Sequence, residues 1–215
     1  MPTVLLPGTL CDAALWTEVK LPAGAYVVPT IQGASLNEAA RGALDGISGP
    51  LHLIGFSLGA IVAFEMLRQL PQRVARLTLL SANPRPPTPQ QLITWNEQER
   101  QVRAGHFGSV VEALAGGPHG PVLAEMAHRV GPSTFLHQLA LLRTRPDSRP
   151  DLARWRGALT LLAGQNDPVT PPDLALEMQR LAPQAQLKVV PHAGHYLPLD
   201  APALISAALL EVAHA

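Results

Sequence analysis

The stretch Leu51-His-Leu-Ile-Gly-Phe-Ser-Leu-Gly-Ala-Ile-Val-Ala-Phe64 contains the pattern that decides the fold of this chain. Residues 51–54 form a short, mainly apolar run, which is typical of a strand buried on both faces. Residues 60–70 then have the pattern of a helix that ends before Pro71. Between strand and helix, residues 55–59 fit the G-x-S-x-G pattern, in which a serine lies on a sharp turn.

The glycines of this pattern have a steric reason. A strand that turns directly into a helix brings the backbone close to the residues two positions before and after Ser57, which are Gly55 and Gly59. Ser57 itself must accept strained backbone angles so that its hydroxyl projects from the edge of the sheet. The pattern therefore indicates a nucleophile, and the alternative is an ordinary glycine-rich turn.

Composition restricts the class of protein. The chain has 215 residues, of which 47% are hydrophobic and 15% charged, and this composition excludes a disordered or fibrous class. The formal net charge is zero, so nothing indicates nucleic acid or a membrane surface as a partner. The single cysteine, Cys11, excludes an internal disulfide, and we expect it to be structural. With no leader-like or membrane-spanning stretch, we expect a soluble cytoplasmic protein.

Short apolar runs alternate with helical patterns over most of the chain, which is typical of an α/β protein with a parallel sheet and helices on both faces. The expected strands are residues 3–6, 25–28, 51–54, 74–80, 158–163 and 186–190. The expected helices are residues 12–19, 35–47, 60–70, 172–181 and 201–212.

A proline-rich break at residues 84–89 interrupts this alternation. From there to residue 156 only helical patterns occur, near 90–104, 109–115, 122–130 and 133–144. We therefore expect an α/β core of residues 1–83 and 157–215, with a helical cap inserted at 84–156. The cap contains nine arginines and six acidic residues. This surplus indicates either a solvated surface or attraction of an anionic substrate or an acidic carrier.

Three chemically capable residues follow three different strands. Ser57, Asp167 and His195 each lie in the short segment that follows an expected strand, and sites in open α/β sheets form at these strand ends. A histidine can remove the serine proton, and an aspartate can hold the imidazole and stabilise its cation. Asp167 could alternatively cap a turn, and His192 is a second candidate base, although it lies directly against a strand end. The irregular spacing of the cap histidines does not fit a metal site.

Four short motifs resemble those of the α/β-hydrolase superfamily. They are Leu6-Pro-Gly-Thr-Leu10, Gly55-Phe-Ser-Leu-Gly59, Asn166-Asp-Pro-Val169 and His192-Ala-Gly-His195. The cap resembles that of the pimeloyl-carrier methyl-esterase and the related menaquinone-pathway synthase group. The resemblance implies that the backbone N–H groups of Thr9 and Leu58 form an oxyanion hole. It also implies about six strands rather than eight, because the chain begins at the strand that is third in this fold. Pro7 stands where many relatives have histidine.

The function that follows is a serine hydrolase that cleaves a carboxylic ester or thioester through an acyl-enzyme, with Ser57, His195 and Asp167 as its triad. We expect no cofactor and no metal, and a small-molecule ester as partner, with an anionic or carrier-linked substrate as one option. The alternatives are a lyase or C–C hydrolase that uses the triad as a base, and a non-catalytic binding module. We expect apolar cap residues to line the acyl pocket, namely Trp95, Phe107, Leu114, Phe135 and Leu139.

Overall fold

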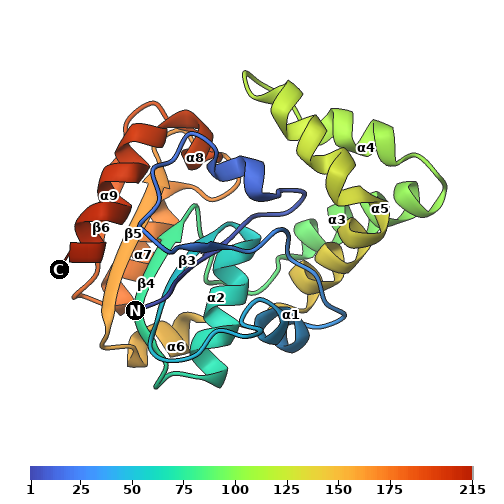
Figure 1. Ribbon diagram of the computed structural model, residues 1–215. Helices are drawn as coiled ribbons and strands as arrows, with labels where there is room; N and C mark the ends of the chain where they lie inside the picture. The colour runs from blue at the N-terminus through green and yellow to red at the C-terminus, as the bar shows by residue number, and fades with distance from the viewer. Residues whose placement is uncertain (215) are drawn as a thin grey trace.

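The computed structural model describes residues 1–214 and contains one six-stranded sheet, in which all neighbouring strands are parallel (Figure 1). The spatial order is β2-β1-β3-β4-β5-β6, so the expected α/β-hydrolase fold with about six strands is confirmed. The strands are β1 (Thr3–Leu6), β2 (Tyr26–Val27), β3 (Leu51–Phe56), β4 (Val74–Leu80), β5 (Ala158–Gly164) and β6 (Gln186–Val190).

The helices alternate with the strands except between β4 and β5, where four follow one another, and after β6, where two do. The core helices are η1 (Ala13–Trp16), α1 (Leu36–Gly42), α2 (Leu58–Gln69), α7 (Pro172–Leu181), α8 (Leu197–Asp200) and α9 (Pro202–His214). Those between β4 and β5 are α3 (Pro89–Arg103), α4 (Phe107–Leu114), α5 (Gly120–Thr144) and α6 (Arg149–Arg154). The segment after Asp12 is shorter than expected, because only one 3₁₀ turn forms there, capped by the Asp12 carboxylate.

Alternate strand residues face two separate apolar clusters, as the period of two in a strand requires. Val4 and Leu53 pack in the cluster with α1, α2 and α7. Their neighbours Leu5 and Ile54 pack on the opposite face in the cluster with η1, α8 and α9. Burial on both faces explains why β3 has a continuous apolar run rather than an alternating one.

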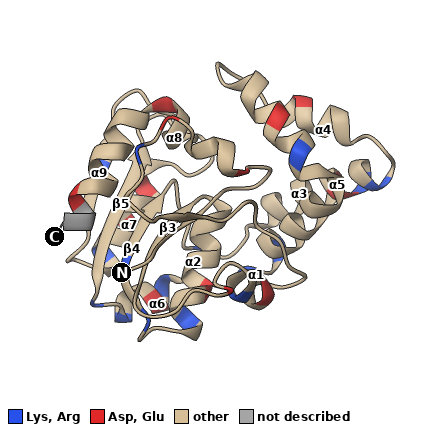
Figure 2. Cartoon of the chain, viewed as in Figure 1, with Lys and Arg blue, Asp and Glu red and all other residues tan. Residues whose placement is uncertain are grey.

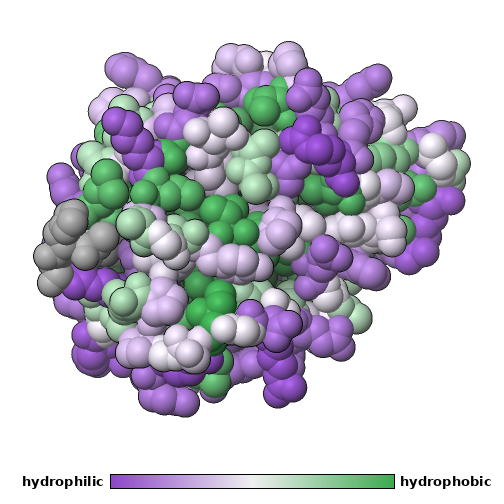
Figure 3. Space-filling view, viewed as in Figure 1, coloured by the Kyte–Doolittle hydropathy of each residue, from purple (hydrophilic) through white to green (hydrophobic). Residues whose placement is uncertain are grey.

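The edges of the sheet are short or charged. β2 pairs with β1 through two residues only, and β6 at the other edge carries Lys188. Short strands and lysine are common devices that prevent an edge from pairing with another chain. On the face in Figure 3, apolar residues show mainly over the core half, with polar residues around them. Within residues 1–214, no helix combines the length and the apolar character needed to cross a bilayer.

Residues 84–156 contain the helices α3 to α6 and no strand among the described residues. Figure 1 shows α3, α4 and α5 projecting from one side of the sheet. Helix α5 is kinked at Gly131, which has φ 78° and ψ 166°. The kink agrees with the break expected between two helical segments, because Pro132 lacks an N–H and disfavours the helical conformation of the residue before it.

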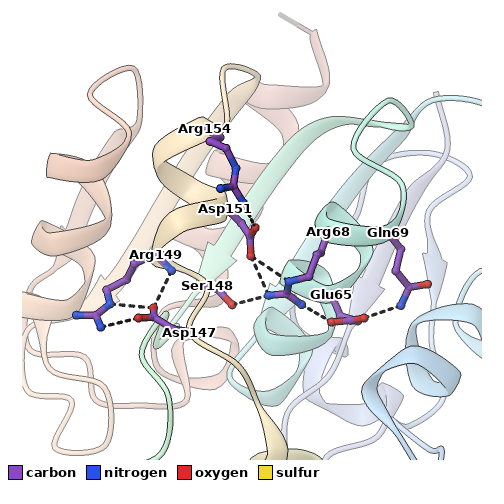
Figure 4. A network of polar contacts seen from close by, with 8 residues as sticks. All are labelled: Glu65, Arg68, Gln69, Asp147, Ser148, Arg149, Asp151 and Arg154. Atoms are coloured by element: carbon purple, nitrogen blue, oxygen red, sulfur yellow. Dashed lines mark hydrogen bonds and ion pairs between the residues drawn. The ribbon is translucent and has the colours of Figure 1, made fainter.

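Helix α6 lies within this range but packs on α2 and α7 of the core. A polar network joins it to α2 (Figure 4). Arg68 of α2 contacts the carboxylate of Asp151 at 2.9 Å and donates to the Ser148 hydroxyl at 3.2 Å, and it also pairs with Glu65. Ser148 is buried, so water competes little for its hydrogen bond with Arg68. The end of the segment is thereby fixed to the helix that follows Ser57.

Candidate active site

Ser57 occupies the turn between β3 and α2 in a strained conformation, with φ 52° and ψ −111°. Glycine is required on both sides of Ser57, because any side chain there would overlap neighbouring backbone atoms. A Cβ on Gly55 would lie 2.6 Å from the Cα of Ala60, and one on Gly59 would lie 2.1 Å from the carbonyl oxygen of Leu6. Such distances are far inside van der Waals contact, so no other residue fits at either position without a backbone shift.

The structure brings Ser57, His195 and Asp167 into one hydrogen-bonded row. The Oγ of Ser57 lies 3.1 Å from Nε2 of His195, and Nδ1 of the same ring lies 2.8 Å from Oδ2 of Asp167. Because an ionised carboxylate only accepts hydrogen bonds, the proton of the neutral ring is assigned to Nδ1. Nε2 is then free to accept the proton of the serine hydroxyl.

Asp167 has a fully buried side chain that is well supplied with donors. Its Oδ1 accepts hydrogen bonds from the backbone N–H groups of Val169 and Thr170, each at 2.8 Å, and its Oδ2 accepts one from the Thr170 hydroxyl at 2.6 Å. Burial by itself raises the pKa of this carboxyl, but the hydrogen bond and charge of His195 and the donors of Thr170 outweigh it, and the pKa falls to about 2. Asp167 is therefore ionised at neutral pH.

The loop that carries His195 is held from both sides. The hydroxyl of Ser81, at the end of β4, donates to the carbonyl of His195 at 2.8 Å, and the Asp200 carboxylate accepts from the N–H of Gly194 at 2.8 Å. His192, the second candidate base, is exposed, and its backbone N–H donates to Gln165. His195 is thus the histidine that contacts Ser57.

The backbone N–H groups of Thr9 and Leu58 have no protein acceptor within residues 1–214. Leu58 is the first residue of α2, where N–H groups have no partner inside the helix. Leu10 follows Thr9 in the turn after β1, which we call the Thr9 turn, and has φ 57°. Gln138 of the helical segment 84–156 holds this turn, because the N–H of Leu10 donates to Oε1 of Gln138 at 2.8 Å. Gln138 is fully buried and also donates to the carbonyl of Ile31 at 3.0 Å.

A cavity of about 270 Å³ opens beside Ser57. On the core side its lining includes Thr9, Ser57 and His195. Of the apolar cap residues expected to line it, the structure places Trp95, Leu114, Phe135 and Leu139 in its wall.

Phe107 is a correction to the expected lining, because it lies outside the wall of the cavity. It is the first residue of α4, and its ring packs on the rings of Phe135 and His128, each with centroids 6.1 Å apart. Phe107 therefore supports the lining residue Phe135 from behind.

A family model described as the alpha/beta hydrolase family matches residues 4–208, which is nearly the whole chain. The chain belongs to the alpha/beta hydrolase family. The family resemblance carried by the sequence motifs is thereby confirmed. An esterase from Thermogutta terrifontis, solved with malate bound, has the same fold, with a TM-score of 0.82 and 24% identity over 100% of this chain and 89% of that one.

Two sequence relatives of this alpha/beta hydrolase carry the name pimeloyl-acyl-carrier protein methyl ester esterase. The protein from Nitrosomonas europaea is 27% identical over an alignment of 178 positions, which covers 75% of this chain and 70% of that protein. The protein from Methylococcus capsulatus is 40% identical over 76 residues, and this match covers 35% of the present chain and only 30% of the relative.

Sequence reasoning missed several residues of the site in this alpha/beta hydrolase. Three of them are polar. Thr170 donates a hydrogen bond to Asp167, Gln138 holds the Thr9 turn, and Arg145 lines the cavity. Thr170 could have been found from its position three residues after Asp167, where a hydroxyl commonly bonds back to a turn carboxylate. No local pattern distinguishes Gln138 or Arg145, because their contacts join distant parts of the chain.

Cys11 also lines the cavity but lacks the features of a nucleophile. Its thiol donates to the carbonyl of Thr9 at 3.4 Å, and burial raises its pKa to about 12. A thiol with this pKa is not ionised at neutral pH, and only the thiolate is reactive. Cys11 therefore has the structural character expected from the sequence.

Proposed function

We propose that the protein is a serine hydrolase that cleaves a carboxylic ester or thioester through an acyl-enzyme, without a cofactor. The observation that carries the proposal is the row Ser57–His195–Asp167, with contacts of 3.1 and 2.8 Å, which opens on a mainly apolar cavity. Family membership supports it, and so do the names of the sequence relatives, which are ester hydrolases.

In the proposed reaction, Oγ of Ser57 attacks the ester carbonyl carbon while Nε2 of His195 takes the hydroxyl proton. The resulting oxyanion accepts hydrogen bonds from the N–H groups of Leu58 and Thr9. His195 then returns the proton to the departing alcohol or thiol, which leaves Ser57 acylated. Water attacks the acyl group next, with His195 as base, and releases the acid and the free serine. Asp167, ionised throughout, stabilises the imidazolium that forms in each half.

Residues 84–156 would act as a cap over the core of residues 1–83 and 157–215, with the acyl chain bound between them. Residues of α3, α4 and α5 share the cavity with Ser57, which supports this role. The proposed substrate is a small-molecule ester, and a carrier-linked substrate fits the names of the relatives. Since the cavity is bounded by cap residues such as Leu114 and Leu139, the cap would set the preferred chain length.

The proposal is tested by hydrolysis of 4-nitrophenyl butyrate. Ser57→Ala and His195→Ala should each lower kcat/KM by roughly 10³-fold or more, and the double variant should be no slower than either single one, because the triad acts as a unit. His192→Ala is the matched control and should stay within about threefold of the wild type. If Ser57→Ala kept more than about a tenth of the wild-type kcat/KM, Ser57 would not be the nucleophile.

The same assay separates the competing functions. A lyase or C–C hydrolase that uses the triad as a base would give no initial burst of 4-nitrophenol, since no acyl-enzyme accumulates. A binding module would give no turnover above that of Ser57→Ala, and a fluorophosphonate would leave its serine unlabelled.

A further inference from the structure

Most arginines of the cap are paired with carboxylates of the protein itself, and two of them are not. Figure 2 shows basic and acidic residues together on the cap helices. Most cap arginines have a carboxylate partner, and these are Arg85, Arg100, Arg103, Arg129, Arg143, Arg149 and Arg154. Arg145 and Arg156 have none among the described residues. The surplus of arginine in the cap therefore does not form one unpaired basic surface among the described residues.

Arg145 is the unusual member, because it is only 5% exposed. Its guanidinium contacts neutral groups: Nε donates to the carbonyl of Arg85 at 2.9 Å, Nη2 to Oε1 of Gln91 at 2.9 Å and Nη1 to the carbonyl of Leu142 at 3.4 Å. It also lies over the ring of Trp95, 5.2 Å from the centroid. These contacts use three of the five N–H donors of a guanidinium. Buried charges are as a rule paired with an opposite charge, and this one is not.

Arg145 belongs to the wall of the cavity beside Ser57. Arg145 lines that cavity, and so do Trp95 and Gln91, the two side chains that contact its charged group. Among the described residues, no other arginine, no lysine and no carboxylate belongs to the lining. Burial lowers the pKa of Arg145 to about 10, so the group remains charged at neutral pH. An anion in the cavity would thus meet one cation in apolar surroundings, where ionic contacts are strong.

We propose that Arg145 binds a carboxylate at the far end of the substrate's acyl chain, so that the preferred substrates are half-esters of aliphatic dicarboxylic acids. The inference rests on the proposed function, since Ser57 must attack the ester end of the same molecule. A carboxylate matches the planar donors of a guanidinium, and the apolar residues of the same lining, which include Leu139 and Phe135, suit the methylene chain. The carboxylate of the substrate then supplies the opposite charge that Arg145 lacks within the described residues.

The first test compares two esters that differ by one methyl group and, through it, in charge. One is the mono-4-nitrophenyl ester of adipic, suberic or sebacic acid, and the other is the same compound with its free carboxyl methylated. In the wild type, kcat/KM should favour the acid for at least one chain length. Arg145→Met should lower the acid-to-neutral ratio roughly 10- to 100-fold, mainly through KM, as expected for a buried charged hydrogen bond.

Arg145→Lys keeps the charge but loses the planar donor set, so its ratio should lie between those of the wild type and Arg145→Met. Arg156→Met removes the other cap arginine that lacks a carboxylate partner and lies outside the cavity lining, so its ratio should equal that of the wild type. An equal loss for both esters in Arg145→Met would assign the residue a structural role, and an unchanged ratio would also overturn the inference.

A binding measurement separates this inference from the proposed function. Monomethyl adipate should raise the Tm of Ser57→Ala, dimethyl adipate should raise it much less, and adding Arg145→Met should abolish the difference. If neither 4-nitrophenyl ester is turned over but this difference is found, the proposed function fails and the carboxylate site stands. If both esters are turned over and both adipates bind equally, the carboxylate site fails and the esterase stands. If Arg145→Met does not fold, the comparison of wild type with Arg145→Lys decides.

Discussion

Replacing Ser57 by glycine should stabilise the fold relative to replacing it by alanine. Ser57 has φ 52° and ψ −111°, a conformation that residues with a Cβ rarely adopt, and such strain costs about 1–3 kcal/mol. Ser57→Ala keeps the Cβ and therefore the strain, whereas Ser57→Gly removes both. Glycine also makes the unfolded chain more flexible, which offsets about 0.4–1 kcal/mol of the gain. The net expectation is that Ser57→Gly is more stable than Ser57→Ala by about 1 kcal/mol.

Urea unfolding of the two variants measures this difference, since both lack the serine hydroxyl. The matching difference in Tm is roughly 2–4 °C for a domain of this size. The control is Ala63→Gly in the middle of α2, where the helical backbone is unstrained and glycine should instead destabilise by about 1 kcal/mol. If Ser57→Gly proved equal to or less stable than Ser57→Ala, the turn would not be strained at this residue.

Three further changes have defined outcomes. Asp167→Asn should lower kcat by roughly 10⁴-fold. The pKa of Asp167 is about 2 in the folded protein against 3.8 in the unfolded chain, so the wild type should lose about 2 kcal/mol of stability as pH falls from about 4 to 2. Asp167→Asn should lack this pH-dependent loss, which unfolding at several pH values checks. Gln138→Leu leaves the buried N–H of Leu10 without an acceptor, so it should lower the free energy of unfolding by about 1–3 kcal/mol and lower kcat more than it raises KM. A change in KM alone would contradict a role of Gln138 in holding the Thr9 turn. His52 is buried with its pKa lowered to about 4, so the wild type should lose about 3 kcal/mol of stability as pH falls from 6.5 to 4, and His52→Gln should show a shallower loss in urea titrations.

The sheet and the triad could be predicted because their signals lie in neighbouring residues. The strand at residues 74–80 and the helix at 172–181 were predicted with the bounds that the structure has. Ser57, Asp167 and His195 each lie within five residues of the carboxyl end of a strand, and parallel strands bring these ends to one edge whatever the length of chain between them. The topology alone thus places the three side chains together.

The polar wall of the site could not be predicted, because its contacts are distant in sequence. Gln138 and Leu10 are separated by 128 positions, and nothing near either residue indicates the contact. Arg145 looks like any other cap arginine until its burial and the pairing of the others are known. Phe107 shows the same limit for apolar residues: its hydrophobicity predicts burial, but the packing of α4 on α5 decides that it supports the cavity wall instead of forming it.

The central claim, a covalent acyl-enzyme on Ser57, is tested most directly by mass spectrometry of the protein quenched with acid during turnover of 4-nitrophenyl acetate. The account predicts a mass increase of one acetyl group, mapped by proteolysis to the peptide that contains Ser57, and no such increase in Ser57→Ala. Turnover without an adduct, or an acetyl group found on another residue such as Cys11, would contradict it.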